Sequence, residues 1–312
     1  MQLYQKPPLN IHEQVQKLKH RGLLIPDEAH ASSCLEQIGF YRLSAYFIPF
    51  EDIGNTSIEH AFLENTHFDQ ILDLYIFDQK LRLLLLESFE RLEVAIRSLW
   101  ANAITIATSD SHAYLHCKHF TSYRQHLKQL NKASSDIDDS NEKFIEHYQR
   151  RYKEPALPPT WAMVETLTFS ALSRWYKNTS SKAIKTQVAD TLGIRTVALM
   201  DSVLASITIV RNTAAHHARC WNRPFVKPLP YIKNLAVALN TYNGNQLDNH
   251  LYKHLVVISH MMKAIQPTTS WQVRLVSEIL TLTPRQQTAM GFPDDWQTMP
   301  FWEGAVQQAK AQ

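Results

Sequence analysis

The stretch FDQKLRLLLLESFERLEVAIR, residues 77–97, is the centre of the longest periodic segment of the chain, which runs from Phe68 to about Ile106. Its apolar residues recur at helical spacing. Acidic and basic side chains follow one another at i,i+4, in the order that stabilises a helix. These pairs are Asp78–Arg82, Glu87–Arg91 and Glu93–Arg97. The segment therefore predicts one long amphipathic helix.

Composition extends this prediction to the whole chain. Only seven of the 312 residues are glycine, whereas sheets joined by tight hairpins need glycine far more often. The apolar content of 45% is enough for a folded core. We therefore predict an all-α fold, with further helices at residues 11–24, 27–38, 160–176, 195–218 and 251–265. The polar stretch NKASSDIDDSNEK, residues 131–143, predicts a mobile loop.

Charge and cysteine content narrow the class of protein. The formal charge of +3 is too even to indicate general affinity for nucleic acid, so that any phosphate binding has to be local. Three cysteines without a C-x-x-C pair fit neither a disulfide framework nor a zinc finger. The beginning, MQLYQKPPLN, has no apolar segment of a signal peptide. We expect a cytoplasmic protein that is neither exported nor embedded in a membrane.

The stretch RNTAAHHARCWNR, residues 211–223, gathers arginines, asparagines and two adjacent histidines directly after an apolar run. On a helix Asn212 and His216 share a face, whereas Arg211 lies about 140° away from His216. Asn212 is thus able to orient the imidazole, while Arg211 wraps around the helix or meets a partner's histidine. A histidine that moves a proton and a guanidinium that steadies negative charge suit cleavage of RNA by its own 2′-hydroxyl.

A second interpretation fits the same residues. Arg211 and the histidine pair also suit a helix C-terminus, where the helix macrodipole favours cations. The spacing alone leaves both interpretations open.

A resemblance to a known family favours the first. The motif R-N-x-x-x-H, Arg211 to His216, resembles the signature of the HEPN superfamily of RNases, and the extended stretch resembles the Abi family of prokaryotic abortive-infection proteins, in its AbiD/AbiF group. Other stretches resemble that family in the same order, and together they span nearly the whole chain. They are KPPLNIHEQVQKLKHRGLLIPDEAHA (6–31), IGFYRLSAYFIPF (38–50), FDQKLRLLLLESFERLEVAIR (77–97), PPTWAMVETLTFSALSRWYKN (158–178) and MGFPDDWQTMPFW (290–302).

The resemblance implies a HEPN-type helical bundle at residues 61–242, with an N-terminal helical element at 1–60 and a C-terminal helical extension at 243–312. It assigns catalytic roles to Arg211 and His216 and an orienting role to Asn212, with His217, Arg219 and Glu165 as candidate additional members. Glu165 either faces the motif from another helix or pairs with a structural arginine.

The implied function is that of a metal-independent endoribonuclease without cofactors, the toxic arm of an antiphage or toxin–antitoxin system. RNA is the expected substrate, and a noncoding RNA is a candidate regulator. Because the chain carries one such motif, a homodimer is expected to supply the second. The alternative is a non-cleaving HEPN protein that binds a structured noncoding RNA.

Two further features are weaker. His112 and His116 have the i,i+4 spacing of two zinc ligands on a helix, but no matching carboxylate pattern accompanies them, so we expect no metal. Tyr41 and Arg42, with Tyr46, are candidates for stacking on RNA, although such an aromatic run more often packs half-buried.

Overall fold

The computed structural model describes residues 7–52, 54, 55, 57–227, 229–239 and 249–311. These residues form fourteen α-helices and six short 3-10 helices. No strand or sheet occurs among them, and three isolated bridges are the only β-type pairing. The all-α prediction is confirmed.

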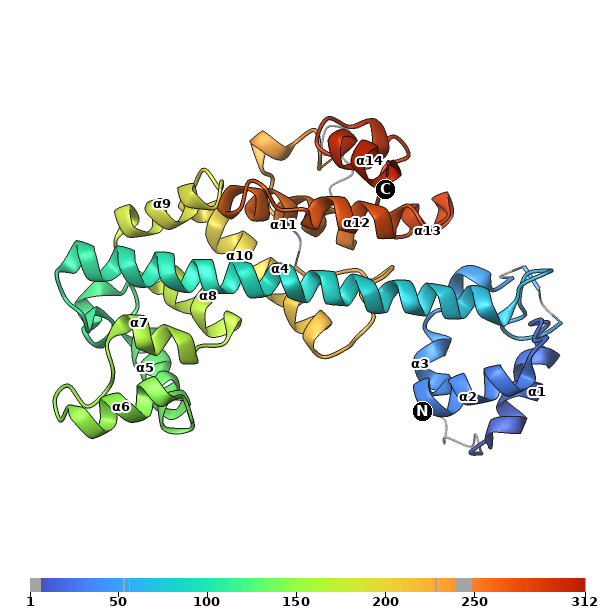
Figure 1. Cartoon of the computed structure of the whole chain (residues 1–312), viewed down its shortest axis with the longest axis horizontal. Coiled ribbons are helices and arrows are strands. Elements are labelled where there is room, and N and C mark those ends of the chain that lie inside the picture. Colours follow the sequence, from blue (N-terminus) through green and yellow to red (C-terminus); the bar gives the residue numbers. More distant parts are fainter. Residues whose placement is uncertain (1–6, 53, 56, 228, 240–248, 312) are drawn as a thin grey trace. The chain divides into compact units, whose positions relative to one another are not determined.

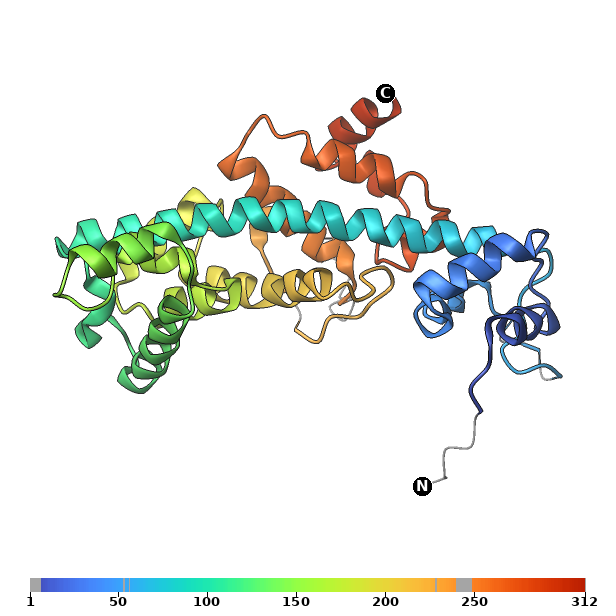
Figure 2. The same cartoon turned by 60° about the horizontal axis from the view of Figure 1, so that its bottom comes forward.

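Helix α4 (Phe68–Thr108) is the long helix that the periodic segment predicts (Figures 1 and 2). Contacts within the chain define two compact units, residues 1–81 and 82–312, and the division falls inside α4. These units do not test the predicted division at residues 60 and 242. The second of those boundaries lies among residues 240–248, outside the described part of the chain.

The first unit consists of short helices and the beginning of α4. Its other helices are α1 (Ile11–His20), α2 (Glu28–Ile38), α3 (Phe40–Ser44) and η1 (Ile48–Phe50). The predicted first helix was too long, because α1 ends in a Schellman motif with Gly22 in the left-handed region at φ 89°. The buried Tyr46 hydroxyl donates to the buried Asp78 carboxylate at 2.6 Å and so ties the segment after α3 to α4.

The second unit is built around α10 (Val197–Ala215), which packs against α8 (Phe169–Asn178), α9 (Lys182–Thr191) and α11 (Leu251–Ile265). In Figure 1 the green segments α5–α7 lie on one side of α4 and the orange to red segments α11–α14 lie on the other. The remaining helices are η2 (Ala113–Leu115), η3 (Cys117–His119), α5 (Tyr123–Asp138), α6 (Lys143–Arg151), α7 (Thr160–Met163), η4 (Val164–Thr166), η5 (Lys233–Leu235), α12 (Trp271–Ile279), α13 (Pro284–Thr288), η6 (Trp296–Thr298) and α14 (Glu303–Lys310).

The predicted mobile loop at residues 131–143 is wrong over most of its length. Helix α5 continues to Asp138, and α6 begins at Lys143, so that only residues 139–142 lie outside helices. The reason is burial: Ala133 and Ile137 continue the buried face that His126 and Gln129 begin. In a stretch of such low hydrophobicity, two well-placed apolar residues are enough to hold the helix.

The predicted single helix at residues 160–176 is also wrong. After α7 and η4 the chain leaves the helical conformation at Leu167, whose ψ is 140°, and Thr168 caps the start of α8 by accepting from the Ala171 amide. The break exposes the Leu167 carbonyl, which accepts a 2.6 Å hydrogen bond from the guanidinium of Arg97 on α4.

The C-terminal tryptophans belong to the core of the second unit. Trp271, Trp296 and Trp302 are all buried. The Trp271 indole donates to the Leu84 carbonyl of α4 at 2.7 Å, and the Trp302 indole donates to the Tyr252 hydroxyl at 3.3 Å.

A buried histidine joins α10 to α11. The Ser206 hydroxyl of α10 donates to the Lys227 carbonyl at 2.9 Å and lies 3.0 Å from Nε2 of His254, whose Nδ1 lies 3.4 Å from the His250 carbonyl. Burial lowers the pKa of His254 from 6.5 to about 4, and the imidazole is therefore neutral in the folded protein near neutral pH.

This burial predicts a loss of stability in acid. Above pH 6.5 His254 is neutral in both the folded and the unfolded chain, whereas between pH 6.5 and about 4 only the unfolded chain takes up the proton. The free energy of unfolding should fall over this range by on the order of 3 kcal/mol on account of His254. Urea unfolding at several pH values measures it. In His254→Gln, which keeps a hydrogen-bonding side chain next to Ser206 but does not titrate, the slope should be flatter than in the wild type; equal slopes would contradict the assignment.

Candidate active site at the end of helix α10

Helix α10 is mostly buried, and its last turns carry the R-N-x-x-x-H motif. Thr196 caps its first turn by accepting from the Leu199 amide at 3.3 Å. By length and hydropathy α10 is apolar enough to cross a membrane, but a buried core helix meets the same criterion, and half of the apolar window is buried inside the protein. One such helix is only a weak indication of a membrane span.

The helix ends at Ala215, three residues earlier than predicted, because the chain turns in a Schellman motif. His216 is the C-cap, the Ala218 amide donates to the Thr213 carbonyl, and the His217 amide donates to the Ala214 carbonyl. His217 occupies the left-handed position, with φ 56°. Glycine holds the corresponding place after α1 and after α9, at Gly22 and Gly193.

Arg211 is half-buried and points to α4. Its Nη2 lies 3.5 Å from Oε2 of Glu93, whose side chain is only 10% exposed. The other oxygen of Glu93 accepts from Arg97 at 2.6 Å. One carboxylate therefore holds two guanidinium groups, one from its own helix and one from the motif.

Arg97 extends this network to the segment between α7 and α8. Besides the Leu167 carbonyl, it contacts the Glu165 carboxylate, with Nη1 3.4 Å from Oε2. Of the two predicted roles for Glu165, the structure shows the pairing with an arginine of the scaffold. Glu165 is linked to Arg211 of the motif through Arg97 and Glu93.

The histidines lie at the surface. His216 and His217 are both exposed, and Arg219 is half-buried. The expected side-chain hydrogen bond from Asn212 to the His216 imidazole does not occur among the described residues. Instead, the His216 amide donates to the Asn212 carbonyl at 3.0 Å, which is a backbone contact of the cap. Asn212 itself is half-buried.

The weaker candidates lie elsewhere. In the first unit Tyr41 is 93% exposed, Tyr46 is buried, and the Arg42 guanidinium lies 5.9 Å from the centre of the Tyr75 ring. His112 and His116 do not share a helix face, because short 3-10 turns cover this stretch. Across the described residues there is no group of three or more His, Cys, Asp and Glu side chains suited to a metal ion.

The protein is thus all-α. The end of one core helix carries an arginine that is anchored by a carboxylate, and two exposed imidazoles follow it. The chain belongs to the Abi-like protein family, whose sequence model matches residues 33–222, more than half of the chain including the whole motif. Membership associates the protein with abortive-infection defence. Comparison with curated proteins and with solved structures gave no match.

Sequence reasoning missed Glu93 as part of the site. The i,i+4 spacing of Glu93 and Arg97 predicted an ordinary pair on a helix surface, and the pair does form. The sequence did not indicate that the Glu93 side chain is almost completely buried. A buried carboxylate needs partners that balance its charge, and Arg211 is one of them.

Replacement of Glu93 should therefore be costly. Glu93→Gln keeps the shape of the side chain but leaves Arg97 and Arg211 without their shared anion, and we expect it to lower the free energy of unfolding by about 1–3 kcal/mol. Urea unfolding measures the change. Glu90→Gln, at an exposed position of α4, is the matched control and should stay within about 0.5 kcal/mol of the wild type. Equal effects of the two substitutions would remove Glu93 from the network.

Proposed function

We propose that the protein is a metal-independent HEPN endoribonuclease, the toxic arm of an abortive-infection or toxin–antitoxin system that acts on RNA in the cytoplasm. His216 exchanges the proton of the 2′-hydroxyl and the leaving oxygen, and Arg211 steadies the negative charge that develops on the phosphate. Membership of the Abi-like family supports the defence role.

The observation that carries the proposal is the way α10 ends. If the histidines and Arg211 only served the helix terminus, they would lie near its last carbonyl groups. These carbonyls are already satisfied by backbone amides: Asn212 by His216, Thr213 by Ala218, and Ala214 by His217. Arg211 is bound to Glu93 on another helix, and the His216 imidazole is exposed. Capping does not account for the exposed imidazole, and the position of Arg211 follows from its pair with Glu93; acid–base chemistry on a phosphate would use both side chains.

The left-handed backbone of His217 supports the same interpretation. A residue with a β-carbon is disfavoured there relative to glycine. A position that retains histidine at this cost suggests a use for the imidazole or for the exact exit of the chain.

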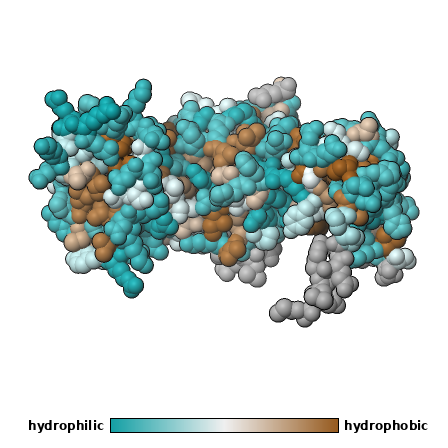
Figure 3. Space-filling model, turned by 90° about the horizontal axis from the view of Figure 1, so that it is seen from below, coloured by the Kyte–Doolittle hydropathy of each residue, from teal (hydrophilic) through white to brown (hydrophobic). Residues whose placement is uncertain are grey.

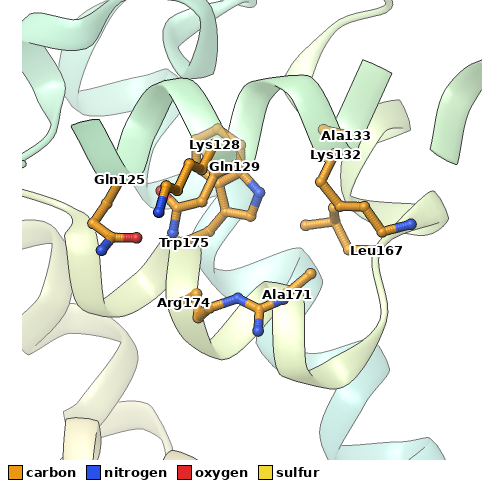
Figure 4. A pocket seen from close by; sticks show the side chains of 9 residues that line it. All are labelled: Gln125, Lys128, Gln129, Lys132, Ala133, Leu167, Ala171, Arg174 and Trp175. Carbon is orange, nitrogen blue, oxygen red and sulfur yellow. The ribbon is translucent and has the colours of Figure 1, made fainter. Parts of the chain in front are cut away.

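A basic cleft between α5 and α8 supports RNA as the substrate. Its volume is about 260 Å³. Figure 4 shows Lys128 and Gln129 of α5 on one side and Arg174 of α8 on the other. Lys132 also lines the cleft and pairs with Asp136 of the same helix, and none of the described lining residues is acidic. Such a group of cations provides local affinity for phosphates in a chain whose overall charge is nearly balanced.

The basic cleft lies next to the ion-pair network. Leu167 lines the cleft with its side chain, and its carbonyl accepts from Arg97, which shares Glu93 with Arg211. A phosphate backbone held in the cleft would thus be placed against the same segment that supports the candidate catalytic arginine.

The alternative function is RNA binding without cleavage. It is favoured by the fact that neither Arg211 nor His216 lines the basic cleft, so binding there does not require the motif. The two functions differ in turnover, which the variants below measure.

Loss of either motif side chain should abolish cleavage. We expect Arg211→Ala and His216→Ala each to lower the rate of RNA cleavage by about 10²–10⁴-fold and to relieve growth inhibition. Arg211→Ala should cost little stability, since Glu93 keeps Arg97 as its partner. His217→Gly is the matched control, because it keeps the left-handed turn without the imidazole. If His217→Gly were the more damaging change, the proton transfer would belong to His217.

The same assay identifies the chemistry. Cleavage should continue in EDTA and leave a 2′,3′-cyclic phosphate or its 3′-phosphate product, and a 2′-deoxy group at the scissile position should block it. Activity that is lost in the chelator and restored by a divalent ion would contradict the metal-independent mechanism.

We further propose that two chains form the working site, because each carries one motif. In a symmetric dimer each α10 end faces its copy. An Arg211→Ala chain mixed with a His216→Ala chain should then recover part of the activity that neither variant has alone. Light scattering during cleavage gives the mass of the active species. A wild-type protein that cleaves as a monomer at micromolar concentration would contradict the shared site.

A further inference from the structure

A second cleft, between α6 and α7, is lined by aromatic rings and is separate from the basic cleft. Its volume is about 560 Å³. The rings that line it belong to Phe144, Tyr148, Tyr152, Trp161, His112 and His147, and Glu165 also lines it. We propose that this aromatic cleft binds an unpaired nucleobase of the RNA strand. The proposal rests on the proposed function and implies that the substrate is single-stranded where it meets this cleft.

The exposure of these rings is unusual for this protein. Six of its seven tryptophans are buried, and Trp161 is 54% exposed. Tyr152 is 52% exposed and Phe144 is 40% exposed. In the region where Figure 1 places α5–α7, Figure 3 shows hydrophobic patches (brown) among hydrophilic residues (teal). Aromatic rings left partly in water can still gain burial by stacking on a ligand.

One wall of the cleft is fixed by hydrogen bonds. The Tyr148 hydroxyl donates to the Pro155 carbonyl at 2.8 Å, and its oxygen lies 3.3 Å from Nε2 of His112. The Ser111 hydroxyl lies 2.9 Å from Nδ1 of His112. Burial lowers the pKa of His112, which favours the neutral imidazole. A wall held in this way loses little freedom when a ring stacks against it.

The chemistry of the lining favours a base over an aliphatic partner. No leucine, isoleucine, valine or methionine is among the described lining residues, which are mostly flat rings and prolines. Flat rings stack on the faces of unpaired bases, whereas paired bases are covered by their neighbours. The carboxylates of Glu154 and Glu165 complement the exocyclic amino groups of bases, which are hydrogen-bond donors.

Glu165 also connects the aromatic cleft to the motif. Its carboxylate lies 3.4 Å from Arg97, and Arg97 shares Glu93 with Arg211. The segment Val164–Leu167 therefore has the aromatic cleft at Glu165 and the basic cleft at Leu167. A strand with its backbone in one cleft and a base in the other would lie across the segment that supports Arg211.

Fluorescence anisotropy with a short, labelled single-stranded RNA of mixed sequence tests the proposal. The full chain carries His216→Ala in every sample, so that the RNA stays intact. Adding Trp161→Ala should weaken binding by about 5- to 150-fold, the effect of losing one stacked base. Trp161→Phe keeps a ring and should restore most of the affinity. Tyr123→Ala removes an exposed ring outside the cleft, and the affinity should remain that of the parent.

Two further measurements identify the ligand. Bound RNA should protect Trp161, the one exposed tryptophan, from acrylamide quenching. A fully paired RNA duplex should show the same affinity for the parent and for Trp161→Ala. The proposal would be overturned if Trp161→Ala weakened the binding of single strand and duplex equally. It would also be overturned if a free nucleoside monophosphate protected Trp161 as well as the strand does.

The outcomes separate this proposal from the proposed function. If the wild type cleaves RNA and Trp161→Ala leaves the affinity unchanged, the nucleobase site alone is overturned. If Trp161→Ala changes the mass of the protein in solution but not its affinity for RNA, the nucleobase site is also overturned, and the cleft is assigned to a second copy of the chain. Loss of affinity in Trp161→Ala without any cleavage by the wild type supports the nucleobase site and overturns the enzyme. Absence of RNA binding by the wild type overturns both.

Discussion

The Glu93 carboxylate between Arg97 and Arg211 is the interaction on which the candidate site depends. A carboxylate that is removed from water is costly unless cations and hydrogen bonds replace its hydration. Glu93 meets this requirement with one arginine from α4 and one from α10. Because the buried Glu93 carboxylate requires cationic partners, it fixes where Arg211 lies relative to α4.

The end of α10 follows from a different constraint, the satisfaction of backbone carbonyl groups. The Schellman motif uses backbone amides for the last carbonyls, and it turns the chain sharply after Ala215. Both histidines then lie at the surface while the helix before them stays in the core. Burial of α10, with the neutral His254 of α11 against its Ser206, gives the exposed groups a rigid support.

Much of the fold could be predicted because it depends on local pattern. Helical periodicity over residues 68–106 gave α4 within two residues of its end, and the predicted bounds of α11 are those of the structure. Helix ends were less predictable: the predicted helices ran past Gly22 after α1 and up to Ala218 after α10. Gly22 is a recognisable stop after α1, whereas His217 in the same backbone conformation is not.

The sequence indicated candidate residues for the site but not their contacts. The motif indicated Arg211 and His216, yet the partner of Arg211 comes from a distant helix. The break at Leu167 has the same origin, since its carbonyl is satisfied by Arg97 rather than by the next turn of helix. No local pattern encodes a contact of this kind. It emerges only when the two segments pack together.

The segment Val164–Leu167 gives the two clefts a common support. It lies against Arg97 through both the Glu165 carboxylate and the Leu167 carbonyl, and these two residues line different clefts. Under the proposed function, binding energy gained from a base and from phosphates at these clefts would act on the position of Arg211 through one short relay. Remote binding energy raises a rate only when it is realised in the arrangement of the reacting groups. A relay through charged side chains meets that condition, because any shift of Arg97 changes the balance of charge around Glu93 and hence the hold on Arg211.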